Sequence, residues 1–139
     1  MKDMAKITVS ATRESIPQVA AFVEGELEKL SCPMKALAQI NIAVDELYSN
    51  IVNYAYEESG APGEASVAVE SAGETSARVT FEDGGVPYNP LAKPDPDTSL
   101  SAEERKIGGL GIFIVKKTMD AMDYKYENGK NILTIIKKW

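Results

Sequence analysis

Histidine is absent from the 139 residues of the chain. Without it the chain cannot form Ser-His-Asp or Cys-His nucleophiles, histidine-ligated metal sites, or a phosphohistidine of its own. Any catalysis must therefore rest on carboxylates, amides, backbone groups or a metal ion held by oxygen ligands.

Cysteine and long hydrophobic runs are also scarce. Cys32 is the only cysteine, so no internal disulfide can form, which fits a reducing compartment. The first ten residues, MKDMAKITVS, lack the apolar run of a signal peptide, and no stretch approaches the ~18 apolar residues of a membrane span. We therefore expect a soluble, cytoplasmic protein that does not contact a membrane.

Positive charge is outnumbered by negative charge. The chain has 15 Lys and Arg against 21 Asp and Glu, which gives a net charge of -6. This balance argues against direct nucleic-acid binding, which needs a basic surface. The length and the 44% of apolar residues fit one domain over residues 1–139 with a single core.

Hydrophobic periodicity predicts the order strand, helix, helix, strand, strand, loop, helix, strand, strand. Such an order on a mostly antiparallel sheet gives a two-layer α/β sandwich, with helices covering one face of the sheet. An Asn-Gly turn at residues 128–129 predicts a terminal hairpin. The predicted ranges are strand 6–11, helix 16–31, helix 34–56, strands 65–72 and 77–81, helix 110–122, and strands 124–127 and 132–137.

Three polar residues lie close together on the predicted helix 34–56. At about 100° per residue, Glu46, Asn50 and Asn53 share an arc of about 60°, and the apolar stripe of the helix centres about 140° away. A solvated face is one explanation, but apolar residues flank the polar ones. The alternative is a site in which Glu46 orients a hydroxyl or a water and an amide oxygen one turn later binds a hard cation such as Mg²⁺.

The segment FEDGGVPYNP, residues 81–90, places a carboxylate at the end of a predicted strand. Asp83 is followed by Gly84 and Gly85, which is a common turn sequence. Alternatively, the sheet end holds the carboxylate in place and the glycines let a flat ligand approach the backbone.

A second glycine-rich segment, KIGGLGIFIVKK, spans residues 106–117. Its glycines precede a strongly apolar helix, so they form either a hinge or an anion site at a helix start. A P-loop needs Gly-Lys-Ser/Thr, but Gly111 is followed by Ile112. A Rossmann loop needs a third glycine at position 114, which is Ile. Any phosphate site here is therefore of another type.

Together these three segments resemble the histidine-kinase-like ATPase (GHKL) superfamily shared by gyrase, heat-shock chaperones, sensor histidine kinases and mismatch-repair proteins. Residues 46–50 match its E-x-x-x-N box, residues 83–86 its D-x-G-x loop, and residues 108–111 its second glycine loop. The chain is most similar to the bacterial anti-sigma-factor serine/threonine kinases, through D-x-G-x-P-Y at 83–88 and G-G-L-G-I at 108–112. The resemblance implies the Bergerat ATP-binding fold, a two-layer sandwich.

The resemblance implies roles for the residues of the helix and of the first loop. Glu46 would be the general base or an orienting carboxylate, and Asn50 would hold Mg²⁺. Asp83 would accept a hydrogen bond from the adenine amino group, and Gly85 would pack near the base. Asn53 has no specific role beyond lining the same pocket.

The resemblance also implies roles for residues around the second loop. Residues 91–107 would form the ATP lid, from which Arg105 would reach the γ-phosphate. Thr134, in the last strand, would assist at the adenine. The phosphates would be bound by the second loop, consisting of Gly108, Gly109, Leu110 and Gly111.

The implied function is an ATP-dependent anti-sigma factor with protein serine/threonine kinase activity, which regulates transcription. It would bind a sigma factor and phosphorylate an antagonist protein, using ATP and Mg²⁺. The resemblance also suggests a homodimer. The alternative is an ATP-binding regulatory module that sequesters a partner without transferring phosphate, and the presence of Glu46 favours the kinase. A plain α/β domain with chance motifs is the third hypothesis.

Overall fold

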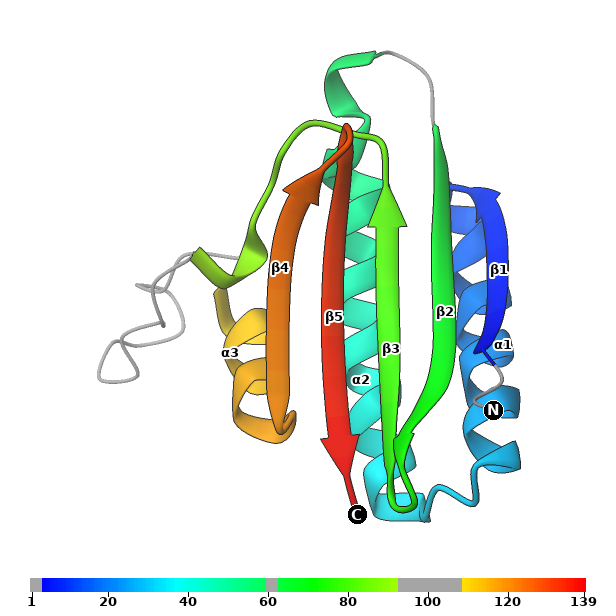
Figure 1. Cartoon of the computed structure of the whole chain (residues 1–139). Helices are drawn as coiled ribbons and strands as arrows, with labels where there is room; N and C mark the ends of the chain where they lie inside the picture. Colours follow the sequence, from blue (N-terminus) through cyan, green and yellow to red (C-terminus); the bar gives the residue numbers. More distant parts are fainter. Residues whose placement is uncertain (1–3, 60–62, 93–108) are drawn as a thin grey trace.

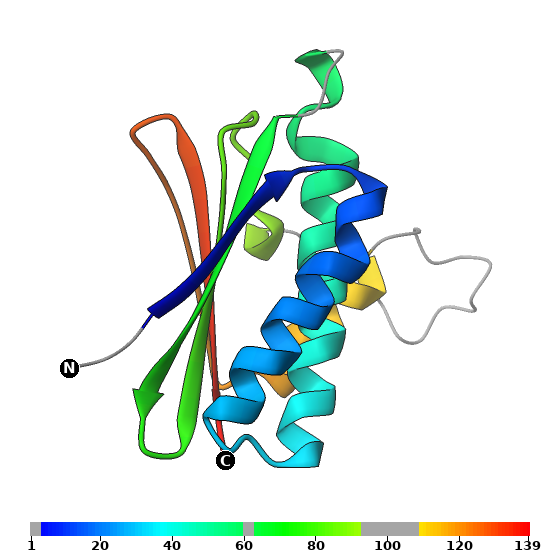
Figure 2. The same cartoon turned by 90° about the vertical axis from the view of Figure 1, so that its right-hand side faces the viewer.

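The computed structural model describes residues 4–59, 63–92 and 109–139. In it the chain forms a single antiparallel sheet with helices on one face (Figures 1 and 2). The five strands run in the order β1-β2-β3-β5-β4, and every neighbouring pair is antiparallel. Figure 2 shows α1, α2 and α3 on the same side of the sheet. The predicted two-layer α/β sandwich and the predicted order of elements are therefore confirmed. The elements are β1 (Met4–Ser10), α1 (Ile16–Lys29), α2 (Met34–Asn50), β2 (Glu64–Gly73), β3 (Ser76–Asp83), α3 (Gly109–Thr118), β4 (Ala121–Glu127) and β5 (Lys130–Lys138).

The core lies between the sheet and the helices. Strand side chains alternate between the two faces, so every second residue of β2, β3 and β5 points toward the helices. The apolar stripes of α1 and α2 meet these residues, and α3 packs beside α2. Fully buried side chains of this layer include Val23, Leu27, Ile40, Leu47, Tyr48, Val67, Val79, Phe81, Ile112 and Ile135.

One predicted helix changes type near its end, and the predicted end of another was wrong. The helix predicted to run to residue 56 is α-helical only to Asn50, and continues as a π-helical turn, Ile51–Ala55. The Ala55 carbonyl accepts a hydrogen bond from the Val86 amide at 3.0 Å, a contact with a distant loop that helical periodicity cannot indicate. The helix predicted to run to residue 122 ends at Thr118, because the chain joins the sheet at once: the Asp120 amide donates to Ile136 O at 2.9 Å.

The terminal hairpin forms as predicted. Asn128 and Gly129 both have positive φ, 54° and 76°, as a two-residue hairpin turn with the right-handed twist of the strands requires. This turn sets the register of β5 against β4, and the separate pairing of β5 with β3 places Asn131 opposite Asp83. Two residues of the candidate site are thereby brought side by side.

None of the helices in the described parts of the chain has both the length and the hydropathy needed to cross a membrane.

Candidate functional site

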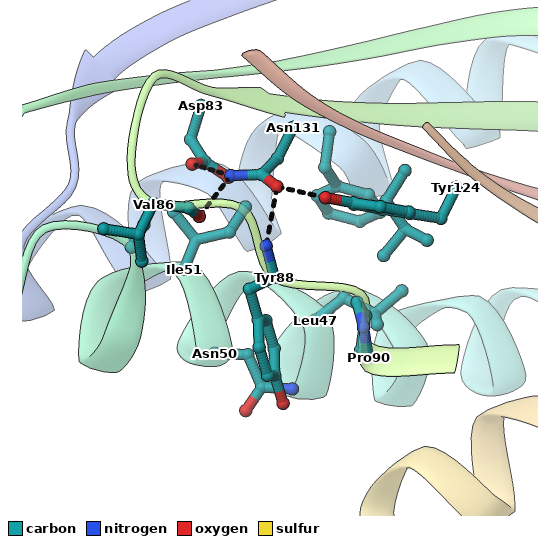
Figure 3. A pocket seen from close by; sticks show the side chains of 12 residues that line it. Leu47, Asn50, Ile51, Asp83, Val86, Tyr88, Pro90, Tyr124 and Asn131 are labelled. Carbon is teal, nitrogen blue, oxygen red and sulfur yellow. Dashed lines mark hydrogen bonds between the residues drawn. The ribbon is translucent and has the colours of Figure 1, made fainter. Parts of the chain in front are cut away.

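A pocket lies between the end of α2 and the sheet, where β3 ends and β5 begins (Figure 3). Most of its wall is apolar, with a few polar groups, as in ligand sites generally. The lining residues are Leu47, Asn50, Ile51, Ala55, Phe81, Asp83, Val86, Tyr88, Pro90, Tyr124, Asn131 and Leu133.

Asp83, the last residue of β3, is the buried carboxylate of this pocket and is only 6% exposed. Its Oδ1 accepts two hydrogen bonds, from Asn131 Nδ2 and from the Gly85 amide, both at 2.9 Å. Burial raises the pKa of Asp83, and these two hydrogen bonds partly offset the rise. Because both donors use Oδ1, Oδ2 remains to accept from a donor in the pocket.

Asn131, at the start of β5, connects the sheet to the loop after β3 (Figure 3). Besides Asp83, its Nδ2 donates to Val86 O at 2.8 Å. Its Oδ1 accepts from the Tyr88 amide at 3.0 Å and from the Tyr124 hydroxyl at 2.5 Å. Asn131 was not among the site residues predicted from the sequence. The available signal was its place in the alternation with Leu133 and Ile135, which puts a polar residue on the core face of β5.

The Asp-Gly-Gly loop packs against the end of the long helix. A Cβ on Gly85 would lie 2.0 Å from the carbonyl oxygen of Ala55, so only glycine allows this approach. The neighbouring amide of Gly84 donates to the Tyr56 hydroxyl at 2.8 Å. Gly85 was expected to pack near a flat ligand, but here it contacts the backbone of Ala55, itself a wall residue of the pocket.

Asn50 and Asn53 differ in their positions. Asn50 lines the pocket, and its buried Nδ2 has no hydrogen-bond partner within the described residues. Figure 3 shows the Tyr88 side chain reaching from the loop toward Asn50. Asn53 is exposed and is absent from the wall. On the helix it lies on the side of Glu46 opposite to Asn50, and its place in the site stays a prediction.

Glu46 lies against the start of α3. A Cβ on Gly111 would fall 1.4 Å from Glu46 Oε1 and 2.3 Å from Cδ, so the carboxylate occupies the space that a side chain at 111 would fill. Glu46 is one turn before Asn50 on α2. The helix box and the second glycine loop, far apart in sequence, therefore meet at one place.

The second glycine loop is only partly described. Gly109 and Leu110 form the first turn of α3 with Gly111, and the amides of a first helical turn have no partner within their own helix. Gly108, Arg105 and all but the first two residues of the expected lid, 91–107, lie outside the described residues. Leu91 and Ala92 belong to a short 3-10 helix, Pro90–Ala92.

Thr134 requires a correction. It is paired with Thr80 and Asp123 on the neighbouring strands and is absent from the pocket wall. Since Leu133 points into the pocket, the next residue points to the opposite face of the sheet. Thr134 is therefore on the wrong face to contact a ligand in this pocket, and Asn131 takes the polar position on β5.

The described geometry combines a buried acceptor in the pocket, Asp83, with a second carboxylate, Glu46, which lies beside the glycine-rich start of α3 and one helical turn before the pocket residue Asn50. Together with the two-layer sandwich, this arrangement suits a ligand that has a planar donor group and a charged, extended tail, as a nucleotide has. Residues 9–137 match the family described as the histidine kinase-like ATPase domain, and the chain belongs to this family.

Individual relatives agree with this assignment. Serine-protein kinase RsbW of Halalkalibacterium halodurans is 27% identical over 132 residues, covering 89% of this chain and 76% of that protein. Serine/threonine-protein kinase BtrW of Bordetella bronchiseptica is 26% identical over 98 residues, covering 69% of this chain and 66% of that protein.

A solved structure shares the fold. The crystal structure of the RsbU and RsbW domains of Rv1364c from Mycobacterium tuberculosis matches with a TM-score of 0.69 and 18% identity. The match covers 98% of this chain and 32% of that chain, so this chain spans about a third of that protein.

Proposed function

We propose that this protein is an ATP-dependent protein serine/threonine kinase that acts as an anti-sigma factor. The observation that carries the kinase proposal is the contact of Glu46 with the Gly111 position, which places a carboxylate beside the glycine-rich start of α3. The family assignment and the relatives named as serine-protein kinases support the same activity.

The residues of the pocket fit ATP. Asp83 Oδ2 is an acceptor for the 6-amino group of adenine, against a wall that includes Ile51, Val86 and Leu133. The unpartnered Nδ2 of Asn50 is a buried polar group that a ligand would satisfy. The amides of Gly109, Leu110 and Gly111 at the start of α3, together with Gly108 and Arg105, are proposed to face the phosphates.

Mg²⁺ is proposed to bind through Asn50 and the phosphates. The described residues contain no group of three or more acidic, histidine or cysteine side chains placed to hold a metal. Mg²⁺ does not require such a cage, because at nucleotide sites it keeps waters and takes oxygens from the phosphates. Its chemistry would be to offset charge on the phosphate oxygens during transfer.

Glu46 is proposed as the general base. It would accept the proton of a serine or threonine hydroxyl as the oxygen bonds to the γ-phosphorus and the bond from that phosphorus to the β–γ bridging oxygen breaks, releasing ADP. Gly111 leaves room for the carboxylate at this position, because a Cβ there would displace it. The protein partners are proposed to be a sigma factor, which the protein binds, and an antagonist protein, whose serine or threonine it phosphorylates.

The remaining features follow from that role. We propose a single ATPase domain over residues 1–139 with its lid at 91–107, which works as a homodimer in the cytoplasm, where sigma factors act. No direct contact with nucleic acid or a membrane is needed for transcription regulation of this kind.

The test is a transfer assay with γ-labelled ATP, Mg²⁺ and an antagonist protein encoded beside this chain. We expect ATP with Mg²⁺ to raise the melting temperature and wild type to label the antagonist. Glu46→Gln should bind ATP within about threefold of wild type but lose transfer by about 10²–10⁴-fold, the usual contribution of a general base. Glu28→Gln, on the exposed side of α1, is the matched control and should transfer normally.

Two results would contradict the proposal in different ways. If wild type bound no adenine nucleotide, both the kinase and the ATP-binding regulatory module would be refuted. If wild type bound ATP and retained a sigma factor but never labelled the antagonist, the protein would be the regulatory module.

A further inference from the structure

The side-chain amide of Asn131 has all of its hydrogen-bonding capacity in use. Its two N–H groups donate to Asp83 Oδ1 and Val86 O, and its oxygen accepts from the Tyr88 amide and the Tyr124 hydroxyl. Asn131 is only 6% exposed, so water does not compete freely for these bonds. Such a network is stable only when every member is satisfied.

The orientation of this amide follows from its partners. A backbone carbonyl can only accept and a backbone N–H can only donate, so Nδ2 must face Val86 O and Oδ1 must face the Tyr88 amide. A flipped amide would set two oxygens against each other and two N–H groups against each other. The N–H that faces Asp83 is therefore fixed by the loop on its other side.

We propose that Asn131 is a specificity-determining positioning residue, which occupies one oxygen of Asp83 and so makes the pocket select adenine over guanine nucleotides. This inference rests on the proposed ATP site. Asn131 acts through Asp83 and is not itself proposed to touch the base.

The chemical reason is the number of acceptors that Asp83 can offer. With Oδ1 taken by Asn131 and Gly85, only Oδ2 is available to a ligand, which matches the single 6-amino donor of adenine. Guanine presents two adjacent donors, N1–H and the 2-amino group, which a carboxylate binds best with both oxygens. Its 6-oxo group is an acceptor and would repel Oδ2. One blocked oxygen therefore discriminates between the bases.

The experiment measures ADP and GDP affinities by calorimetry for wild type, Asn131→Ala and Asn131→Thr. We expect wild type to favour ADP strongly. Asn131→Ala should bind ADP about 10- to 100-fold more weakly, the range for losing a hydrogen bond to a charged group, with GDP affinity unchanged or higher. Asn131→Thr keeps a hydroxyl that can donate to Asp83, so it should restore part of the preference and serves as well if the alanine variant fails to fold.

The matched control is Ser15→Ala, which removes a buried hydrogen bond of 2.6 Å to Tyr48, and neither of these two residues lines the pocket. It should lower stability while leaving the ratio of ADP to GDP affinity unchanged. The inference is overturned if a folded Asn131 variant keeps the wild-type ratio, or if Ser15→Ala changes the ratio as much. In both cases ADP binding by wild type would leave the proposed function standing, whereas wild type that bound no ADP would overturn both.

Discussion

Replacing Gly111 with alanine tests whether Glu46 and the second glycine loop act as one site. The added Cβ would lie 1.4 Å from Glu46 Oε1, 2.3 Å from Cδ and 3.0 Å from Cγ. No backbone atom stands among these nearest neighbours, so the clash is relieved by moving the Glu46 side chain. The variant therefore displaces the carboxylate while the rest of the fold stays in place.

The size of the displacement sets the expected loss of activity. Ordinary van der Waals contact begins at 3.4 Å, so Oε1 must retreat by about 2 Å from its present distance of 1.4 Å. A misplacement of about 1 Å in a reacting group can cost about 10²-fold in rate. We therefore expect phosphate transfer to fall by at least ~10²-fold, or about 2.7 kcal/mol of transition-state stabilisation. Stability should change by about 1 kcal/mol or less, because alanine in a helix gains about 0.5–1 kcal/mol over glycine and offsets the cost of rotating Glu46.

The assay measures kcat for transfer, ADP affinity and melting temperature for Gly111→Ala. Gly25→Ala is the matched control, since Gly25 is also helical and a Cβ there meets nothing within 4 Å. It should stabilise the protein slightly and leave transfer unchanged. In a Glu46→Gln background, Gly111→Ala should cost little more, because the group that it displaces is already disabled. Wild-type transfer by Gly111→Ala, or full additivity with Glu46→Gln, would refute the idea that this glycine holds the carboxylate.

Three further predictions concern the first loop. Because burial raises the pKa of Asp83, its contribution to folding is fully present below the ordinary value of 3.8 and is lost as pH rises through the raised pKa. The unfolding free energy of wild type relative to Asp83→Asn, measured in urea, should therefore fall as pH rises across that window, and a flat difference would contradict the raised pKa. Asp83→Asn should also bind ADP about 10- to 100-fold more weakly. Gly85→Ala should destabilise the protein by about 3 kcal/mol, since its Cβ meets Ala55 backbone at 2.0 Å, whereas Gly84→Ala, whose Cβ lies 3.5 Å from the Tyr56 hydroxyl, should cost under ~0.5 kcal/mol in the same titration.

Local patterns predicted the parts of the molecule that local physics controls. The helical spacing of apolar residues predicted α1 and α2. The Asn128-Gly129 pair predicted a hairpin turn, and both residues have positive φ in the structure. The apolar helix α3 was harder, because a segment that is apolar on all sides has no periodicity to mark its end. Its last residue was therefore placed beyond Thr118.

The site was predicted less completely, because it depends on contacts between distant segments. The angles on the predicted helix grouped Glu46, Asn50 and Asn53 together. Angle alone could not distinguish Asn50, which lines the pocket, from Asn53, which does not. Which side of Glu46 faces the pocket depends on where β3 and β5 end, which the helix sequence does not contain. The contact of Glu46 with Gly111 likewise depends on how α3 packs beside α2.

The choice between Asn131 and Thr134 shows what a combination of local rules can add to a motif. Both residues are polar and both belong to β5, and a resemblance to the family directed attention to Thr134. The hairpin turn sets the register, and strand alternation then puts Asn131 on the face of the buried Leu133 and Thr134 on the other face. A polar residue on the core face needs partners, and the residue opposite it on the neighbouring strand is Asp83. The turn and the period of two thus put Asn131 on the core face, whereas its pairing with Asp83 also requires β5 to lie beside β3, a contact between distant segments.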